Sequence, residues 1–347
     1  MKAARFRGGG EPLLVEEVAE PALRPGSAIL RARATFVPPV TANLLGADPG
    51  YILPPAPFTP GMDTVGTVEA VADDVAGIEP GEAVYCDHYH PAGHCFLGAF
   101  GMSRDSRPVL ARWPNGGFAE RLALPAEHLT PLRDAASLGP EILCRLGWLG
   151  TAYGGLVRAG LGPGQCLVVT GATGLVGTGG ILLALAMGAA RIVALGRRRA
   201  VLDALAALDP KRIIPIAVEE GQDAGKDIAA AAGGADVVLD AIGDTDDAGV
   251  TRSAIRALGR GGRAVFVGGL TTQPPVTATY MVLRGLTVIG STWFPRAAAG
   301  EMLAMIVGGA LDLSSLSART FPLAQINEAI AAAGDGGGGF EHVALVP

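Results

Sequence analysis

Residues 166–199 contain the stretch that decides the fold. Cys166-Leu-Val-Val-Thr170 predicts a buried strand, and Gly171-Ala-Thr-Gly174-Leu-Val-Gly177 predicts a tight turn. An apolar helix follows as far as Met187, and a second strand is predicted over 191–195. A glycine turn between strand and helix lets the backbone approach a pyrophosphate, and the helix N-terminus offers amides and a positive dipole end. This order predicts a dinucleotide site, the alternative being a glycine-rich turn in an unrelated α/β protein.

The composition of the whole chain limits its function classes. Its 347 residues are enough for two domains with substantial cores. With 27 basic and 33 acidic residues and no long block of one sign, the charge pattern indicates neither a nucleic-acid face nor a membrane surface. The N-terminal positive charges are not followed by an apolar run, and no apolar stretch reaches spanning length. We expect a cytoplasmic protein that acts on a small-molecule substrate, without a nucleic-acid or membrane partner.

The residue pattern changes at about position 133. Before it, segments such as 28–37 and 63–72 are short, β-rich and broken by Pro and Gly, which is typical of an antiparallel, barrel-like domain. After it, apolar strands alternate with alanine-rich helices, which predicts a doubly wound parallel sheet and an α/β fold. A last helix over 324–333 and a strand over 341–346 are expected to return to the first domain. The strands expected in the second part are 166–170, 191–195, 212–216, 236–240, 263–267 and 286–290.

Five motifs carry a resemblance to a known family. They are Gly61-Met-Asp-Thr-Val-Gly66, Gly81-Glu-Ala-Val84, Gly117-Phe-Ala-Glu120, Thr151-Ala-Tyr-Gly154 and Asp236-Val-Val-Leu-Asp-Ala-Ile-Gly243. With these motifs the chain resembles the medium-chain dehydrogenase/reductases along nearly its full length.

The resemblance implies the domain organisation. A GroES-like catalytic domain over 1–133 and 291–347 is expected to be interrupted by a Rossmann domain over 134–290. Family members commonly dimerise through edge strands of the Rossmann sheet, and the segment 276–289 is available for this. A homodimer is therefore expected by analogy.

The same resemblance bears on zinc. Many members of the family hold a catalytic zinc through Cys, His and Cys side chains, and these positions correspond to Pro38, Met62 and Gly147. Proline and glycine offer no donor, and a thioether is a poor zinc ligand. We therefore expect no catalytic zinc. Cys144 lies three residues from one of these positions and is interpreted as a packed thiol.

Residues 85–95 contain three of the five histidines of the chain, at the place where the family has a structural zinc lobe of four cysteines. Because the segment has only two cysteines and a proline, we expect no metal there, although a relocated metal near His88 and His94 stays open. The resemblance also implies that residues after this strand line the substrate pocket. Asp87, His88 and Tyr89 are thus candidates to bind or protonate a substrate, or else polar residues that cap a loop.

The end of the second Rossmann strand bears on the choice of cofactor. NAD-preferring enzymes have a carboxylate there, which binds the adenosine hydroxyls. This chain has Gly196, followed by Arg197, Arg198 and Arg199. Because a guanidinium binds a 2′-phosphate through two parallel hydrogen bonds, NADPH is predicted in preference to NADH. If the arginines only form a solvated helix start, the choice stays open.

The candidate site residues fall into three groups. Candidate catalytic residues are Tyr51, His88 and Asn43, and candidate pocket residues are Asp87, Tyr89, Trp148 and Trp293. The expected cofactor-binding residues are Thr151, Gly171, Ala172, Thr173, Gly174, Leu175, Val176, Gly177, Gly196, Arg197, Arg198, Ile242, Gly268, Gly269, Ser291 and Thr292.

The predicted reaction follows from the missing zinc ligands. The zinc-free branch, which includes quinone oxidoreductases and zeta-crystallin, transfers hydride to quinones or to a C=C bond conjugated with a carbonyl. Val37-Pro-Pro-Val40 and Phe58-Thr-Pro60 resemble that branch, but Asn43 replaces a frequent tyrosine and Thr41 replaces an acid. No proton donor is therefore assigned by resemblance. The alternatives are an alcohol dehydrogenase or carbonyl reductase, without zinc or with a relocated metal, and a non-catalytic NADPH-binding protein.

Overall fold

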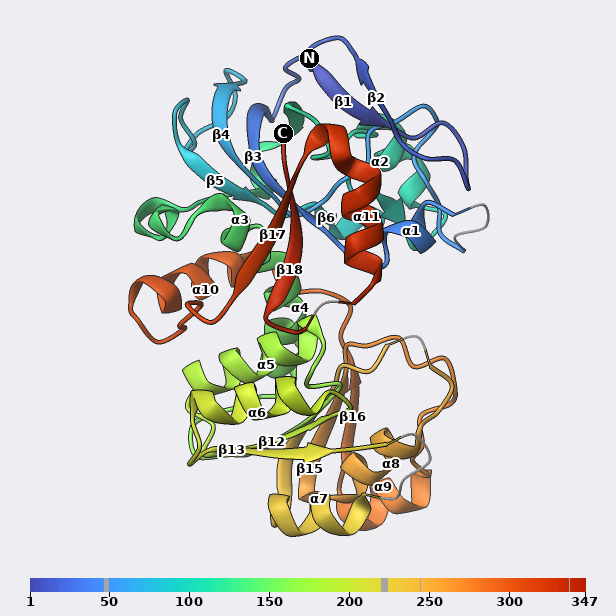
Figure 1. Ribbon diagram of the computed structural model, residues 1–347, viewed down its shortest axis with the longest axis vertical. Helices are drawn as coiled ribbons and strands as arrows, with labels where there is room; N and C mark the ends of the chain where they lie inside the picture. The colour runs from blue at the N-terminus through green and yellow to red at the C-terminus, as the bar shows by residue number, and fades with distance from the viewer. Residues whose placement is uncertain (47–49, 220–223, 244, 337) are drawn as a thin grey trace. The chain divides into compact units, whose positions relative to one another are not determined.

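The computed structural model describes residues 1–46, 50–219, 224–243, 245–336 and 338–347. They form two compact units (Figure 1). The first comprises Met1–Gly147, Leu316–Gly337 and Glu341–Pro347, and the second comprises Trp148–Ser315 and Gly338–Phe340.

The boundaries of these units differ from the predicted positions 134 and 290. Residues 134–147 belong to the first unit because helix α3 (Pro140–Leu143) packs on its strands β3 (Ser27–Val37), β4 (Thr64–Val71) and β17 (Ser317–Pro322). Residues 291–315 belong to the second unit. The ring of Phe294 fills the space above Gly150, where an added Cβ would lie 2.2 Å from it. A change in the residue pattern shows where a series of strands begins, whereas the boundary of a compact unit depends on which residues pack together.

The first unit is built on a seven-stranded sheet with the order β10-β5-β4-β3-β18-β17, and β9 also pairs with β3. The terminal strand β18 runs antiparallel to β3, with Val343 opposite Val37, so the predicted return of the tail to the first domain is confirmed. The strands of this sheet are β3 (Ser27–Val37), β4 (Thr64–Val71), β5 (Ala83–Cys86), β9 (Arg121–Pro125), β10 (Leu129–Pro131), β17 (Ser317–Pro322) and β18 (Glu341–Val346).

Smaller elements flank this sheet. Helix α11 packs on β18 and β17 (Figure 1), and the predicted helix over 324–333 is therefore confirmed with a short 3₁₀ turn before it. A two-stranded and a three-stranded sheet complete the unit. These elements are β1 (Lys2–Arg5), β2 (Leu14–Glu17), β6 (Tyr89–His90), β7 (Cys95–Phe96), β8 (Phe100–Gly101), α1 (Thr41–Leu44), α2 (Ser106–Arg112) and α11 (Ile326–Gly334). The 3₁₀ turns are η1 (Pro91–Gly93), η2 (Ala126–His128), η3 (Arg133–Leu138) and η4 (Leu323–Gln325).

The second unit contains a six-stranded parallel sheet with the order β13-β12-β11-β14-β15-β16. Numbered along the chain, the strands have the order 3-2-1-4-5-6, which is the doubly wound Rossmann arrangement. The switch point, at which successive strands begin to be added on the other side of the sheet, lies between β11 and β14. The predicted fold class is confirmed. The strands are β11 (Cys166–Thr170), β12 (Arg191–Gly196), β13 (Ile213–Ala217), β14 (Ala235–Asp240), β15 (Leu258–Phe266) and β16 (Thr287–Gly290).

The strand predicted over 263–267 starts too late in the chain. Strand β15 begins at Leu258 instead of 263, because Leu258 pairs with Ala235 before the register shifts. The glycines at 259, 261 and 262 hide this extension in the sequence. Helix α4 (Leu146–Arg158) begins in the last residues of the first unit and continues into the second. The other helices of the second unit are α5 (Leu175–Ala186), α6 (Arg199–Leu208), α7 (Gly225–Ala232), α8 (Gly249–Arg256), α9 (Ala278–Arg284) and α10 (Ala297–Val307).

Within the part of the chain that the structure describes, none of the helices combines the length and the apolar character needed to cross a membrane.

Candidate functional site

The glycine turn has the geometry that a nucleotide requires. It connects the end of β11 to the start of α5, beside the point where the strand order reverses. Gly171 has a φ of +63°, which favours glycine. A Cβ on Gly177 would lie 2.2 Å from the carbonyl oxygen of Gly171, so only glycine allows the helix to pack this close to the turn. A helix that begins directly after such a turn directs its N-terminal amides toward the turn, which is the arrangement that holds a pyrophosphate in this fold, and the residues present fit a dinucleotide.

In the conformation of this chain, the end of β12 has no room for the carboxylate side chain that is typical of NAD-preferring enzymes. A Cβ on Gly196 would lie 2.5 Å from the methyl carbon of Thr173. Arg198 donates a hydrogen bond to the carbonyl oxygen of Thr173, which brings this guanidinium next to the glycine turn. Burial, with a smaller effect from Arg197, lowers the pKa of Arg198. Arg199 instead pairs with Asp203 at 3.0 Å along helix α6.

The neighbouring strand ends bring other predicted cofactor residues together. Gly268 lies against Ile242, where an added Cβ would be 2.0 Å from the carbonyl oxygen, and its amide donates to the carbonyl of Asp240 at 3.1 Å. Ser291 is buried, and Thr292 is exposed. Of the other predicted cofactor residues, Ala172 and Thr173 are buried, Gly174, Leu175, Val176 and Thr151 are half-buried, and Gly269 and Arg197 are exposed.

The predicted pocket tryptophans differ in their surroundings. Trp293 is buried and stacks on Phe294 with ring centroids 4.8 Å apart. Its carbonyl oxygen lies close to Gly154, where an added Cβ would be 2.5 Å away. Trp148 is half-buried. Stacking on Phe294, whose ring lies against Gly150 of helix α4, thus places Trp293 in a packed environment, which a sequence alone does not separate from a pocket role.

A buried carboxyl group occupies the first unit next to one of the lost zinc positions. Asp63 is fully buried, and its Oδ1 accepts a 2.8 Å hydrogen bond from the hydroxyl of Tyr85. A Cβ on Gly147 would lie 2.2 Å from Asp63 Oδ1. Burial raises the pKa of Asp63 well above its usual range, Asp87 raises it further, and the bond from Tyr85 opposes both.

This arrangement does not fit the zinc site of the family. Pro38 and Gly147 have no donor atom, Met62 has only a thioether, and the carboxyl of Asp63 blocks the space that a side chain at 147 would need. The thiol of Cys144 is directed elsewhere, with its sulfur 3.2 Å from the carbonyl oxygen of Glu141. Burial raises the pKa of Cys144 well above its usual range, as expected for a packed thiol.

The three predicted catalytic residues lie in different environments. Asn43 is exposed on α1, and Tyr51 is 47% exposed. His88 is fully buried, with Nδ1 donating to the carbonyl of Leu97 at 2.8 Å. Burial lowers the pKa of His88 to about 4, so its ring is neutral at pH 7. A buried neutral ring is a poor proton donor, and this placement weighs against the predicted role of His88.

An aromatic row connects two of the predicted residues. Tyr51 contacts Phe100 with ring centroids 4.8 Å apart, Phe100 contacts Phe96 at 4.9 Å, and Phe96 contacts Tyr89 at 5.2 Å. The hydroxyl of Tyr89 lies 2.8 Å from Nδ1 of His94. Asp87 is buried, and its Oδ1 accepts from the amide of Tyr89 at 2.9 Å, as in the predicted loop-capping alternative.

Sequence reasoning missed the pair formed by Asp63 and Tyr85. Asp63 stands inside the Gly61–Gly66 motif, and a charged residue within an apolar β-rich segment is itself a signal of a paired or protonated carboxyl. Its partner is 22 residues away and is brought near by the pairing of Val65 with Tyr85 between β4 and β5. A strand register of this kind is not visible in one sequence.

Comparison with known proteins agrees with the two-part architecture. Residues 24–134 match the model of the alcohol dehydrogenase GroES-like domain, and residues 176–308 match the model of the zinc-binding dehydrogenase family. The chain is 27% identical over 314 residues to acryloyl-coenzyme A reductase of Metallosphaera sedula, covering 89% of this chain and 90% of that protein. It is 28% identical over 335 residues to an alcohol dehydrogenase of a Moraxella species, covering 94% of each.

A solved structure shows the same fold. A cobalt- and zinc-bound thermostable alcohol dehydrogenase from Pyrobaculum aerophilum superposes with a TM-score of 0.77 at 26% identity, covering 100% of this chain and 99% of that one. The two family matches, together with this fold, place the chain among the oxidoreductases. The chain belongs to the medium-chain dehydrogenase/reductase superfamily. The names of its relatives include both alcohol dehydrogenases and an acryloyl-coenzyme A reductase, so they do not single out the quinone oxidoreductase branch.

Proposed function

We propose that this protein is a zinc-independent, NADPH-dependent reductase of quinones or of the C=C bond of α,β-unsaturated carbonyl compounds. The observation that carries the proposal is the absence of metal-binding side chains at Pro38, Met62 and Gly147, together with the Asp63 carboxyl against Gly147. An isolated carbonyl accepts hydride poorly without an electrophile. In a conjugated acceptor the charge spreads onto an enolate oxygen, which a few hydrogen-bond donors stabilise.

The cofactor part of the proposal rests on the second unit. The turn at Gly171–Gly177 would bind the pyrophosphate, and Arg197 and Arg198 would bind the 2′-phosphate beside Gly196. NADPH, when bound, supplies the hydride. The lack of a carboxylate at the end of β12 supports NADPH over NADH.

The substrate part of the proposal rests on the first unit. The hydroxyl of Tyr51 is the proposed hydrogen-bond donor to the enolate oxygen, because this side chain is 47% exposed and its ring is held against Phe100. Asn43, which is exposed on α1, is a second proposed donor. Tyr89, which continues this aromatic row through Phe96, is proposed to line the pocket. The relative named acryloyl-coenzyme A reductase supports the reaction class, since acryloyl thioesters are activated alkenes.

Product analysis tests the proposal. Metal-depleted protein is incubated with NADPH and 2-cyclohexenone, and the products are separated by gas chromatography. We expect the saturated ketone, which requires hydride addition to the C=C bond. Tyr51→Phe should lower kcat at least about tenfold if its hydroxyl stabilises the enolate. Allylic alcohol as the product would contradict the proposal.

A second candidate is an alcohol dehydrogenase or carbonyl reductase. The alcohol dehydrogenase names of a relative and of a similar structure favour it. Formation of allylic alcohol in the same assay would support this candidate, and so would oxidation of simple alcohols with NADP⁺ or NAD⁺.

A further inference from the structure

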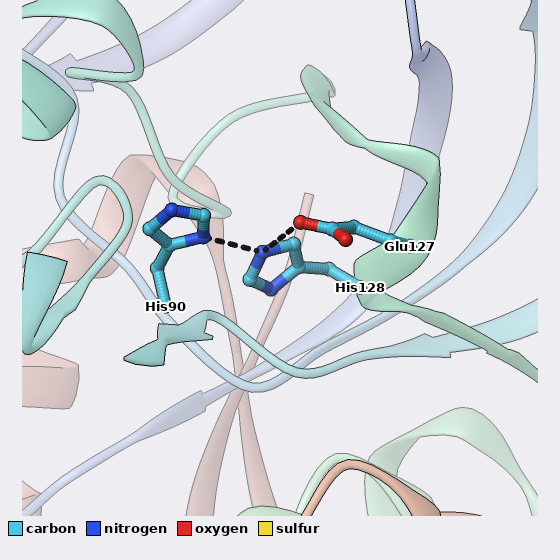
Figure 2. A group of neighbouring side chains, drawn as sticks. All are labelled: His90, Glu127 and His128. Carbon is cyan, nitrogen blue, oxygen red and sulfur yellow. Dashed lines mark hydrogen bonds and ion pairs between the residues drawn. The ribbon is translucent and has the colours of Figure 1, made fainter. Parts of the chain in front are cut away.

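Three side chains in the first unit converge outside the site described above (Figure 2). His90 comes from β6, and Glu127 and His128 come from η2. Nδ1 of His90 lies 3.2 Å from Nε2 of His128, and Oε1 of Glu127 lies 3.8 Å from the same Nε2. One nitrogen or oxygen atom from each of the three residues lies within 4.8 Å of the other two. Two imidazoles and a carboxylate are a donor set that proteins use for divalent transition metals.

The backbone fixes the orientation of His128. Its Nδ1 donates to the carbonyl oxygen of Asp87 at 2.6 Å, and its own carbonyl accepts from the amide of Asp87 at 3.0 Å. Because Nδ1 carries the proton, Nε2 has the lone pair, and this lone pair faces His90 and Glu127. A histidine that ligates a metal is usually held by such a second hydrogen bond from its other nitrogen to a carbonyl.

The spacing of the two nitrogens agrees with a shared ion. Two ligands of a tetrahedral zinc, each about 2.0–2.1 Å from the metal, lie about 3.3 Å apart. The nitrogens of His90 and His128 are 3.2 Å apart. Oε1 of Glu127 is 3.8 Å from Nε2 of His128, which is 0.5 Å longer than the ligand spacing in a tetrahedral zinc site. Because the side chain of Glu127 is 55% exposed, its carboxylate can move toward the two rings. An ion would thus replace the contact between the two rings with little change in the backbone.

The cluster is reached from the surface. His90 and Glu127 line a cleft of about 770 Å³, whose walls also include Asp74 and Arg112. These two residues add one charge of each sign. His128 forms the buried end of the cluster, with 2% of its surface exposed. The cleft therefore gives an ion an entry path, and water can occupy a fourth position on the open side.

We propose that His90, Glu127 and His128 bind a divalent transition-metal ion, with zinc as the expected physiological occupant. This site differs from the Cys-His-Cys set and from the four-cysteine lobe of the family. The sequence predicted no metal in residues 85–95, whereas the proposed site includes His90 of that segment. The other two ligands, Glu127 and His128, lie outside the segment and could not be paired with it from the sequence. The ion would join the small β6-β7-β8 sheet to the connection between β9 and β10. It takes no part in the proposed hydride transfer.

Zinc binding by tag-free, metal-depleted full-length protein tests this site. We expect one zinc per chain by calorimetry and by elemental analysis after gel filtration. His90→Ala and Glu127→Gln should each weaken binding at least about tenfold, as loss of a ligand does. His94→Ala is the matched control, because His94 lies in the same segment but contacts Tyr89 instead of the cluster. Its zinc affinity should equal that of the wild type.

Cobalt substitution distinguishes the donor set. Co²⁺ bound to nitrogen and oxygen ligands should give a visible d–d spectrum without the near-ultraviolet charge-transfer band of a thiolate. Failure of the wild type to bind zinc would overturn the proposal, and so would equal binding by His90→Ala. A thiolate band, or loss of binding only in His94→Ala, would overturn it as well.

Discussion

The glycine turn of the second unit and the polar interior of the first unit achieve their chemistry in different ways. Around Gly171 and Gly177 the groups that would bind the ligand are backbone amides, and glycine is required because a side chain at either position would clash with neighbouring backbone atoms. In the first unit the chemistry lies in side chains, such as Asp63 with Tyr85 and His90 with His128, that come from segments far apart in the sequence. A contiguous motif therefore defines the first kind of site, whereas strand register defines the second.

The largest expected effect is in the glycine turn. Gly177→Ala places a Cβ 2.2 Å from the carbonyl oxygen of Gly171. Because backbone must shift, we expect the free energy of unfolding to fall by about 1–3 kcal/mol. NADPH affinity should fall at least about tenfold, since the same amides are displaced. Urea unfolding and fluorescence titration with NADPH measure the two effects.

Gly300→Ala is the control for this substitution. Gly300 lies within helix α10, and an added Cβ there meets no atom within 4 Å. We expect a gain of about 0.5–1 kcal/mol from the better helix propensity of alanine. If Gly177→Ala also stabilises the protein and leaves NADPH affinity unchanged, the turn is not the closely packed backbone site described here.

A smaller effect is expected from the buried interior of the first unit. Burial lowers the pKa of His342 to about 4, with a further contribution from Arg145. Below pH 6.5 this histidine becomes protonated in the unfolded chain but stays neutral in the folded chain. The free energy of unfolding therefore decreases as the pH falls from 6.5 toward 4. This loss is about 2 kcal/mol at pH 5.

Urea unfolding at pH 7.5 and at pH 5 checks this effect. In His342→Gln the side-chain amide can donate to the carbonyl of Glu141, as Nε2 of His342 does at 2.8 Å, but it does not titrate. The difference in unfolding free energy between the two pH values should therefore shrink by about 2 kcal/mol. An unchanged difference would show that the ring protonates freely in the folded state.

The smallest expected effect is on cofactor choice. Arg197→Ala and Arg198→Ala should each raise the KM for NADPH about tenfold, which corresponds to one charge-assisted phosphate contact, and leave the KM for NADH nearly unchanged. Arg199→Ala is the control, because Arg199 pairs with Asp203. Steady-state kinetics with both cofactors measures the ratio. An equal change for NADH and NADPH would mean that the arginines support the turn rather than the 2′-phosphate.

The sequence predicted the Rossmann unit well because its signals are local. Strand, turn and helix follow one another within about 30 residues, and the 3-2-1-4-5-6 order comes with the βαβ pattern. The strand starts deviated where glycines are dense, as at Leu258. Most of the predicted cofactor residues follow the strand ends of this sheet, whereas Thr151 lies in helix α4, and the binding of NADPH by these residues stays a prediction.

The first unit was harder to predict because its contacts depend on register. Pairing of Cys86 with Leu129 brings His128 opposite Asp87 and next to His90. Pairing of Thr64 with Cys86 brings Asp63 near Tyr85. The density of histidines in 85–95 was visible, but these rings diverge: His88 binds Leu97 and His94 binds Tyr89. Without the strand registers, the sequence shows which polar side chains are present but not which of them lie next to one another.

The most direct test of the account is the dependence of enone reduction on zinc. The rate of cyclohexanone formation from 2-cyclohexenone and NADPH is measured with His90→Ala protein, so that the additional metal site does not contribute, before and after complete metal removal. We predict the same kcat at zero and at one equivalent of zinc. Activity that falls with metal removal and returns in proportion to added zinc would contradict the claim that this chain transfers hydride without a catalytic metal.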